Sequence, residues 1–448
     1  MRALLAAILT TVLPMIVGRR WLSGPVVVTW SLGAVVGIVL LALGGLLGGL
    51  VGWPVLGAGL ALVVGWVLGP RLRCDVNPGT LPPGVSRVLL LILAVGIALM
   101  GMSLWRPVAS WDAWFTWSIK AKGLAVARSF DSPVFVSRSY DWTSQSYPTL
   151  LPSWQALAYI VSGDLSVSWP LQFQQAWLWT AGAIALLALC GGYSSGALLL
   201  PLAWVVAPQV VWQSMQGYAD VPLAFPLILG TLLLWTKRRD RHGQILAGVL
   251  LAGAALMKAE GLPLVAVTLP CVLVTRKPSA SLLIAPSIVA AAWLPWFVFT
   301  LVHGTAAGGM VTVPAVTALL HGTVPSRLTE IVWIMGQAIF YPVRWGLLAP
   351  ACLVTGLIGR RVAPRLGAAT LLQLALLAAV YDITWYYQGT PLEHFMATNV
   401  ERIIIGPLGV LALAVGLGPW ESPRPAAVPS VPALDSSSRS PTAALGHS

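Results

Sequence analysis

The stretch PVVVTWSLGAVVGIVLLALGGLLG, residues 25–48, decides the fold because it contains no charged side chain. A helix rises about 1.5 Å per residue, so a run of this length spans the roughly 30 Å hydrocarbon core of a bilayer. The whole chain has the same character, since 57% of its 448 residues are hydrophobic and 9% are charged. Soluble domains carry about 25% charged residues. This composition excludes a water-soluble globule, a disulfide scaffold and a nucleic-acid-binding protein.

Apolar runs of similar length recur along the chain and predict an all-α polytopic membrane protein with about 11 to 14 transmembrane helices. Two of them, 244–258 and 261–275, are short and predict half-helices that meet near Lys258. The first run is followed by Arg19 and Arg20 instead of a small-residue cleavage site, so we interpret it as a retained membrane segment. The runs are 3–18, 25–48, 51–69, 87–105, 169–190, 194–212, 218–235, 244–258, 261–275, 281–301, 329–358, 366–387 and 403–419.

Basic residues in short loops predict the orientation, because Lys and Arg are retained on the cytoplasmic side of a membrane. Four basic clusters are separated by even numbers of predicted spans, which places them all inside. They contain Arg71 and Arg73, then Lys237, Arg238, Arg239 and Arg241, then Arg276 and Lys277, and finally Arg360, Arg361 and Arg365. The segments 106–168, 213–220, 258–261, 302–328 and 388–402 then face outward.

Composition divides the chain into three parts. Residues 1–86 are expected to form N-terminal transmembrane helices, and residues 87–419 a transmembrane core with the long outer loop 106–168. Residues 420–448 are rich in Pro and Ser and contain too few large apolar groups to bury a core, so they predict a disordered cytoplasmic tail. The expected location is the plasma (inner) membrane, with the active face toward the periplasm or exterior.

Cysteine and glycine patterns exclude several kinds of site. The four cysteines lie far apart in the sequence, so neither a disulfide nor a zinc site is expected. The glycine-rich run 44–49 is a surface for close helix packing. The sequence contains no glycine motif for binding nucleotide phosphates or dinucleotides, so neither ATP nor NAD is implied. The cysteines are Cys74, Cys190, Cys271 and Cys352.

The outer loop begins with a tryptophan-rich strip, SWDAWFTWSIKAK at 110–122. Trp111, Trp114 and Trp117 are three residues apart and predict one flank of an amphipathic helix in the membrane interface. Asp112 is the one acid among these rings. A carboxylate close to low-dielectric surroundings has a raised pKa, which suits a general base or a metal ligand. The alternative is an interfacial acid that only caps or solvates the helix.

Two other outer segments place charges at unusual positions. Asp220 lies at the start of an apolar run and is either a ligand-binding acid or a helix N-cap. Lys258 and Glu260 interrupt a long apolar stretch, where ionisable groups are costly unless they pair or line a wet cavity. A turn between two half-helices would let both side chains point into one cavity. The alternative is a short turn whose charges reach water.

The last outer turn gathers polar residues on one helix face. His394, Thr398 and Arg402 lie within roughly 80° of each other at about 100° per residue. They are interpreted as either a site for a lipid phosphate or the solvated start of a helix. Arg344 and Asp382 are weaker candidates, which either line a lipid groove or extend to the membrane interface.

Five segments occur in the order seen in a known group of enzymes. They are WDAW with KAK behind it at 111–122, YPTLLP at 147–152, GYADVP at 217–222, KAEG at 258–261 and the polar turn 394–402. Together they resemble bacterial GT-C membrane glycosyltransferases, a group similar in plan to aminoarabinose transferases and protein mannosyltransferases. The resemblance implies a GT-C-like fold, a polyprenyl-phosphate-linked sugar as donor and a catalytic acid at Asp112.

The resemblance also implies roles for the other charged residues, and two departures limit it. Ala113 follows Asp112 where many members carry a second acid, so a role for a divalent metal is left open and no other cofactor is implied. Residues 144–146 stand where relatives often have His and Asp. The implied donor-binding cations are Lys120, Lys122, Lys258, His394 and Arg402, and the implied hydroxyl-binding acids are Asp220 and Glu260.

The sequence therefore predicts a glycosyltransferase that moves a sugar onto a glycan, lipid or protein acceptor with inversion, using Asp112 as general base. Its partners are the bilayer, the polyprenyl-phosphate sugar and the acceptor, with no nucleic acid. The alternative from another class is a secondary transporter or flippase of a lipid-linked or small solute, since buried charges and broken helices also mark transport paths. A third interpretation is a non-catalytic subunit that binds a polyprenyl lipid.

Overall fold

The computed structural model describes most of the chain and shows an all-helical architecture. The expected tail at 420–448 lies outside the described residues, and for residues 394, 395, 397 and 398 only the backbone is described. The described residues are 1–77, 81, 83–108, 110–192, 195–237, 240–273, 280–305, 317, 321, 326–359, 363–384 and 391–417.

Helices account for nearly every described element, and one short parallel pair of strands joins Leu22 to Cys74. The longer helices are α1 (Arg2–Arg19), α2 (Val26–Leu50), α3 (Pro54–Leu68), α4 (Pro83–Ser103), α7 (Leu150–Ser162), α8 (Trp169–Gly191), α9 (Ser195–Val205), α11 (Asp220–Thr236), α12 (Arg241–Met257), α13 (Gly261–Leu273), α14 (Ile284–Val302), α16 (Leu328–Ile339), α18 (Leu348–Gly359), α19 (Pro364–Thr384), α20 (Leu392–Ile403) and α21 (Ile405–Leu417). The short elements are β1 (Leu22–Ser23), β2 (Cys74–Asp75), η1 (Ala113–Ser118), α5 (Ile119–Ala127), α6 (Pro133–Val136), η2 (Arg138–Thr143), α10 (Pro208–Gln213), η3 (Ala280–Leu283) and α17 (Pro342–Trp345).

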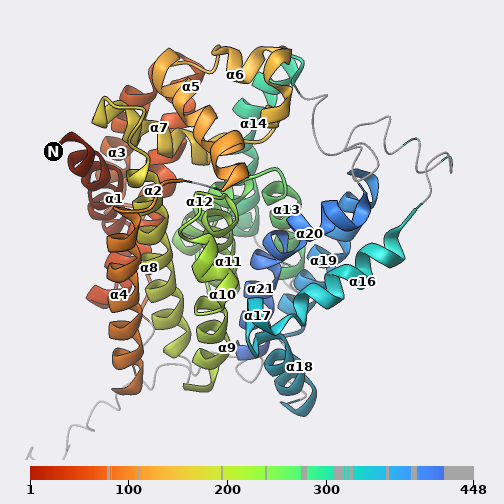
Figure 1. Cartoon of the computed structure of the whole chain (residues 1–448). Coiled ribbons are helices and arrows are strands. Elements are labelled where there is room, and N and C mark those ends of the chain that lie inside the picture. Colours follow the sequence, from red (N-terminus) through yellow and green to blue (C-terminus); the bar gives the residue numbers. More distant parts are fainter. Residues whose placement is uncertain are drawn as a thin grey trace, which may run out of the picture.

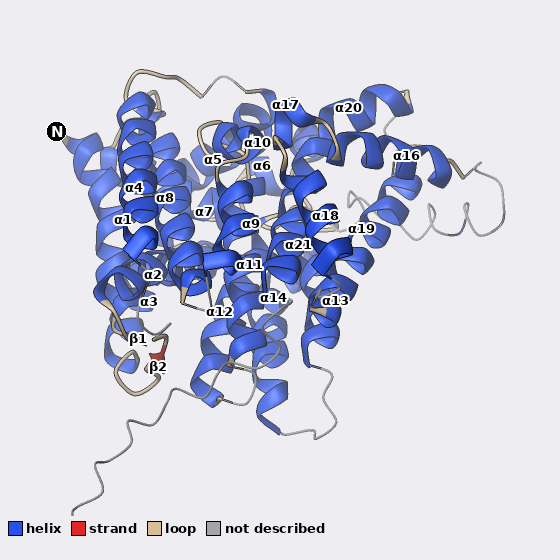
Figure 2. Cartoon of the chain, turned by 90° about the horizontal axis from the view of Figure 1, so that it is seen from below, coloured by secondary structure: helices blue, strands red, loops and turns tan. Residues whose placement is uncertain are grey.

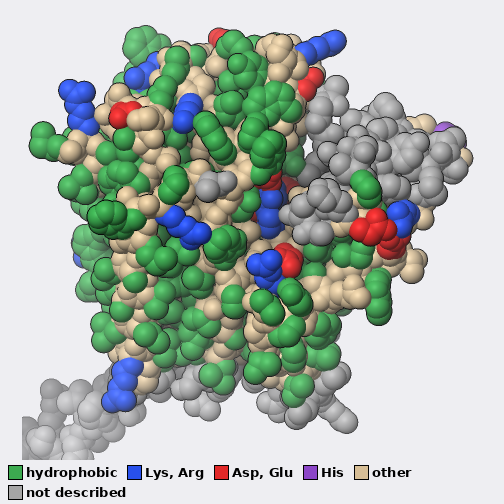
Figure 3. All heavy atoms as spheres, viewed as in Figure 1, with side chains coloured by type: hydrophobic (Ala, Val, Ile, Leu, Met, Phe, Trp, Pro, Cys, Tyr) green, Lys and Arg blue, Asp and Glu red, His purple; other side chains and the backbone are tan. Residues whose placement is uncertain are grey.

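Six helices in the described part are long and apolar enough to cross a membrane, namely α1, α2, α4, α8, α14 and α19. Six shorter apolar helices accompany them, namely α3, α11, α12, α13, α16 and α21. Large apolar side chains on α4 point outward, and Leu90 is 64% exposed. Hydrophobic side chains also cover most of the face in Figure 3. An exposed apolar surface of this extent is stable in lipid, so the chain is a membrane-embedded, all-α protein.

Two layers organise the molecule (Figure 1). Helices α4, α8 and α11 stand upright beside one another, with α8 in contact with both of the others. The outer loop supplies α5, α6 and α7, which lie across the upper ends of the upright helices. Helices α16 and α20 pack together at the opposite side of the molecule from α1, as Figure 2 also shows. The outer loop thus forms a cover over one end of the helices.

Glycines allow α1 and α2 to approach closely. A Cβ added at Gly37 would lie 1.8 Å from the carbonyl oxygen of Pro14, and one at Gly18 would lie 2.0 Å from that of Gly33. Small residues at such crossings let the two backbones touch, which provides the van der Waals contact that joins helices in lipid. The close crossing is therefore encoded by glycine at positions 18, 33 and 37.

Gly37→Ala is expected to destabilise the protein by about 1–3 kcal/mol, because the added methyl forces apart two backbones that have no room to move. Thermal unfolding of the purified protein measures the effect. Gly59→Ala in α3 is the matched control, since a Cβ there meets nothing within 4 Å. An equal change in both variants would contradict the role of the crossing.

The chain path brings basic clusters to one end of the molecule. The thiol of Cys74 lies 3.9 Å from Oδ2 of Asp240, so the loop that holds Arg73 contacts the loop before Arg241. Ala363, close to Arg365, donates its N–H to the carbonyl of Ala414 near the same end of α21. Arg73, Arg241 and Arg365, which belong to three of the four predicted clusters, therefore lie toward one end of the helices. The outer loop and the start of α11 lie at the other end.

Two predicted spans are broken in the structure. The run 329–358 divides into α16, α17 and α18, because Pro342 begins a new helix and Gly346 adopts a positive φ of 57°. The run 194–212 divides at Pro208 into α9 and α10. Proline removes a backbone donor and clashes with the preceding turn, so each break follows from local sequence. Predicting one continuous span for each run was wrong.

The predicted tryptophan flank is only partly present. Trp111 and Trp114 are exposed, but Trp117 is buried and its ring lies 5.9 Å from that of Tyr147. Residues 113–118 form a π-helix, in which hydrogen bonds join residues five apart. The turn is wider than in an α-helix, so residues three apart no longer share a flank. Trp117 therefore anchors the strip to the core.

Candidate functional site

A buried ion network joins residues from four distant segments. The ammonium of Lys258 lies 2.9 Å from Oδ1 of Asp220 and 3.2 Å from Oε1 of Glu260. Nε of Arg402 lies 3.1 Å from Oδ2 of Asp220, and Nη1 of Arg402 pairs with Oδ2 of Asp112. We call these five residues the acid–base cluster. It brings together five of the eight residues to which the resemblance assigns a role.

Helix ends position the cluster. Asp220 is the first residue of α11, and Lys258 ends α12 in an extended conformation with φ −156° and ψ 161°. The chain turns at once into α13, where a Cβ on Gly261 would lie 2.0 Å from the carbonyl oxygen of Ala254. Only glycine fits this turn, which confirms the predicted pair of half-helices. Both charged side chains of the turn are then directed inward and buried.

Two alternative interpretations of these residues are wrong. Asp220 is not a helix cap, because the N-cap of α11 is Ala219 and no side chain caps the helix. Lys258 and Glu260 do not reach water, because both are buried. A buried charge is costly unless it is paired, and the carboxylates of Asp220 and Glu260 each pair with a cation. The packing of α11 on α12 supplies that pairing.

Exposure differs sharply within the cluster. The side chain of Asp220 is 3% exposed, whereas that of Asp112 is 35% exposed. Asp112 belongs to the outer cover, and Arg402 belongs to α20. Arg402 therefore connects the interior of the cluster to its accessible edge. A ligand that approaches from outside meets Asp112 first.

Three carboxylates and two cations give the cluster a formal charge of −1. Burial opposes the charge of Arg402, but Asp220 and Asp112 beside it outweigh this effect and raise its pKa. The guanidinium also stacks over the ring of Tyr218 at 4.1 Å. Arg402 is thus a fixed cation, held by two acids and one aromatic face.

Two tyrosines that were not among the predicted site residues join the site. The hydroxyl of Tyr381 on α19 donates to Oε1 of Glu260 at 3.3 Å. Tyr218 lies within the GYADVP segment, two residues before Asp220, so its position was a usable signal. Tyr381 gives only a weak signal, because aromatic residues near the ends of membrane helices are common.

The predicted cations of the outer loop lie apart from the cluster. Lys120 is fully buried and donates to the carbonyl oxygen of Ser144 at 2.5 Å. Lys122 is half-buried, with its ammonium 4.5 Å from the ring of Trp114. Neither forms an ion pair with a carboxylate among the described residues. The side chains of His394 and Thr398 lie outside the described part of the structure, so their predicted roles stay predictions.

Lys120→Met is expected to remove a pH dependence from stability. Burial lowers the pKa of Lys120 from 10.5 to about 7. Between these values the unfolded chain holds a proton that the folded chain has lost, so the stability of the natural chain, relative to the variant, increases as pH rises. Thermal unfolding of both proteins across this range measures the difference. A difference that stays constant with pH would contradict the prediction.

The two weaker candidates have structural partners. Arg344 forms an ion pair of 2.8 Å with Glu401. Asp382 accepts the N–H of Arg327 at 2.7 Å and the hydroxyl of Ser326 at 2.8 Å, so it fixes the start of α16. These contacts account for both residues without a ligand.

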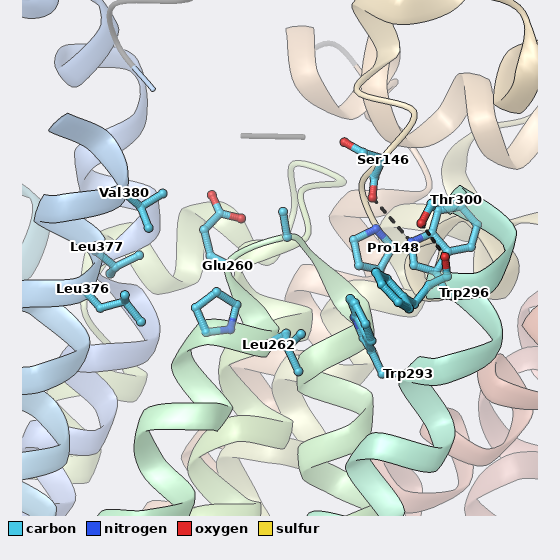
Figure 4. Close-up of a pocket in the computed structure, with 13 residues that line it drawn as sticks. Ser146, Pro148, Glu260, Leu262, Trp293, Trp296, Thr300, Leu376, Leu377 and Val380 are labelled. Carbon is cyan, nitrogen blue, oxygen red and sulfur yellow. Dashed lines mark hydrogen bonds between the residues drawn. The ribbon is translucent and has the colours of Figure 1, made fainter. Parts of the chain in front are cut away.

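An apolar groove of about 420 Å³ adjoins the cluster at Glu260 (Figure 4). Ligand sites commonly measure about 300–1,000 Å³. The groove lies between α13, α14 and α19, beneath a segment of the outer loop. Glu260 lies between the aliphatic side chains of α19 and the tryptophans of α14. Its lining comprises Ser146, Pro148, Ala259, Glu260, Leu262, Pro263, Trp293, Trp296, Phe297, Thr300, Leu376, Leu377 and Val380.

The donor set of the cluster does not fit a divalent metal. Both oxygens of Asp220 are bonded to cations, and Arg402 lies between Asp220 and Asp112. Within the described residues no three His, Cys, Asp or Glu side chains gather around a common centre. We therefore derive no step through a metal.

Comparison with known proteins gives no match: no family model, curated protein or solved structure is significantly similar to the chain.

Proposed function

We propose that the chain is a membrane glycosyltransferase of the GT-C type, which uses a polyprenyl-phosphate sugar on the outer side of the plasma membrane. The observation that carries the proposal is the position of Asp112. Its carboxylate lies at the accessible edge of a buried acid–base cluster and is held there by Arg402. The order of the sequence segments that resemble this group supports the same interpretation.

Arg402 links donor binding to base activation in this proposal. The phosphate of the donor binds Arg402 from the accessible edge and replaces Asp112 as its partner, since charge-assisted pairs with phosphate are strong. Asp220 is deeply buried and keeps its bonds to Arg402 and Lys258. Asp112 is then free to accept a proton. This exchange limits the repulsion of the phosphate, because the cluster with Asp112 in place already carries a formal charge of −1.

The transfer step follows from this arrangement. Asp112 accepts the proton of an acceptor hydroxyl, and the hydroxyl oxygen attacks the anomeric carbon from the face opposite the phosphate. The bond from that carbon to the phosphate oxygen breaks, and the polyprenyl phosphate leaves with the bonding electron pair. Arg402 stabilises the charge of the leaving phosphate. The new glycosidic bond has inverted configuration.

The setting of the site supports a lipid-linked donor. The cluster joins the start of α11 and the end of α12 to Asp112 in the outer loop, away from the basic loops at the other ends of these helices. By the positive-inside rule the end that holds the cluster faces the periplasm or exterior, where nucleotide sugars are absent. A donor carried by a membrane lipid meets this requirement. The acceptor is a glycan, lipid or protein on the same side.

The alternative is a transporter or flippase of a lipid-linked or small solute. Buried ion pairs and the broken α12–α13 unit support it, because both features mark transport paths. Transport sites commonly lie near the middle of the membrane. The acid–base cluster lies instead at the ends of its helices, which favours chemistry at the surface.

The test supplies the purified protein with several labelled polyprenyl-phosphate monosaccharides and a membrane extract as acceptor source. Transfer of label to an acceptor, with release of the polyprenyl phosphate, supports the proposal. Reconstitution in liposomes separates the alternatives, since a flippase moves the labelled lipid across the bilayer and leaves its sugar attached. Movement without transfer would overturn the glycosyltransferase proposal.

A further inference from the structure

One carboxylate oxygen at the groove has no partner. Oε1 of Glu260 is bonded to Lys258 and Tyr381, but Oε2 is buried and accepts no hydrogen bond from any described residue. A buried acceptor left unsatisfied costs about 1–3 kcal/mol, and more when it is charged. A ligand that donates a hydrogen bond to Oε2 would remove this cost. The groove therefore has a defined polar end.

The rest of the groove is mostly apolar, with Ser146 and Thr300 as its other polar side chains, and it reaches the lipid-facing surface. Trp293 and Trp296 of α14 face Leu376 and Leu377 of α19 across it (Figure 4). Phe297 lines the groove and is itself exposed on α14, a helix that is long and apolar enough to span the membrane. A hydrocarbon chain from the bilayer matches these walls, because burying it there removes no polar contact.

The charges around Glu260 select the head group of such a ligand. An anionic head is repelled by the carboxylate, and Lys258 already divides its attraction between Glu260 and Asp220. A cationic head is repelled by the same Lys258, which lies 3.2 Å from Oε1 of Glu260. An uncharged hydroxyl avoids both repulsions and still donates the hydrogen bond that Oε2 lacks.

We propose that the groove binds a membrane amphiphile with an apolar chain and an uncharged hydroxyl head, whose O–H donates to Oε2 of Glu260. The binding itself is independent of the proposed transferase. Only one further step rests on that proposed function, namely that the bound alcohol is the acceptor. Glu260 is then the anchoring residue for the acceptor.

The test uses the full-length protein in nanodiscs and three photoreactive probes of equal chain length: an alcohol, its phosphate monoester and the corresponding amine. Crosslinked peptides are identified by mass spectrometry. The alcohol is expected to label α14 or α19 at least about tenfold more efficiently than the phosphate or the amine, the ratio that about 1.4 kcal/mol produces. Equal or stronger labelling by the phosphate would overturn the proposal.

Two variants sharpen the result. Leu376→Trp fills the groove and is expected to abolish labelling by the alcohol. Leu372→Trp, one turn earlier on α19 and exposed, is the matched control and keeps it. Glu260→Gln removes the charge and is expected to lower the preference for alcohol over phosphate. Unchanged labelling in Leu376→Trp would refute the site even if Glu260→Gln does not fold.

No sugar donor is present in this experiment, so its outcome is separate from that of the transfer assay. Selective alcohol binding in a chain that transfers no sugar supports the groove and overturns only the glycosyltransferase. Sugar transfer without selective binding of the alcohol would support the glycosyltransferase and overturn the proposal for the groove.

Discussion

Replacing Lys258 with methionine is expected to destabilise the protein by about 3–5 kcal/mol, the usual cost of removing one partner from a buried ion pair. Lys258 is the only cation paired with Glu260 among the described residues, and it shares Asp220 with Arg402. Its loss changes the formal charge of the cluster from −1 to −2 in a buried setting. Methionine keeps the length of the side chain, so the effect reports charge and not volume. Thermal or denaturant unfolding in detergent measures it.

A double variant tests whether the unpaired buried charge causes this loss of stability. Lys258→Met combined with Glu260→Gln returns the formal charge to −1 and is expected to recover at least half of the lost stability. Arg138→Met is the control for removal of a cation, because Arg138 is exposed in the outer loop and a change within about 0.5 kcal/mol is expected there. A double variant less stable than Lys258→Met would show that the pairing is not the stabilising feature.

Asp112→Asn is expected to lower sugar transfer by about 10²-fold or more, as the loss of a general base does. The amide keeps an oxygen that accepts from Arg402, and Asp220 continues to hold the guanidinium, so the fold is preserved. The measurement is the initial rate of transfer from a labelled polyprenyl-phosphate sugar at saturating acceptor. An equal midpoint of thermal unfolding for the natural protein and the variant establishes that the lower rate is not caused by unfolding.

The control for this prediction is Asp141→Asn, in the same outer loop. Asp141 is exposed and lies outside the acid–base cluster, so its variant should keep the natural rate. Loss of activity in both variants would indicate a general effect on the loop. Full activity in Asp112→Asn would remove Asp112 from the catalytic role.

The composition of individual segments predicted much of the fold. A run such as 25–48 becomes a helix in any arrangement, because lipid offers no partner for its backbone groups. The turn at Lys258 and Gly261 was also predictable, since two charges and a glycine interrupt an apolar stretch. The break at Pro208 was missed because apolar length was weighed above proline, and the run 329–358 was predicted as one span although Pro342 can open a helix.

The residues of the acid–base cluster were predicted from the sequence, but the ion pairs between them were not. Asp112, Asp220, Lys258, Glu260 and Arg402 were all identified as candidates. Lys258 and Glu260 were found from the cost of ionisable groups at membrane depth, and the other three from their positions in outer segments. The structure shows that Lys258 and Arg402, two of the implied donor-binding cations, are both paired with acids. Lys120 was also assigned to the donor, yet it lies under the outer cover against Ser144.

The sequence alone determined that this protein is a set of helices embedded in a membrane. It also determined which side chains have a high free-energy cost of burial there, because hydropathy and charge are local properties. Only the tertiary structure decided how those charges are satisfied. Lys258 meets Asp220 across 38 residues, and Arg402 meets Asp220 and Asp112 across 182 and 290 residues. The partner of a buried charge is chosen by which helix ends pack together, and no property of a single segment contains that information.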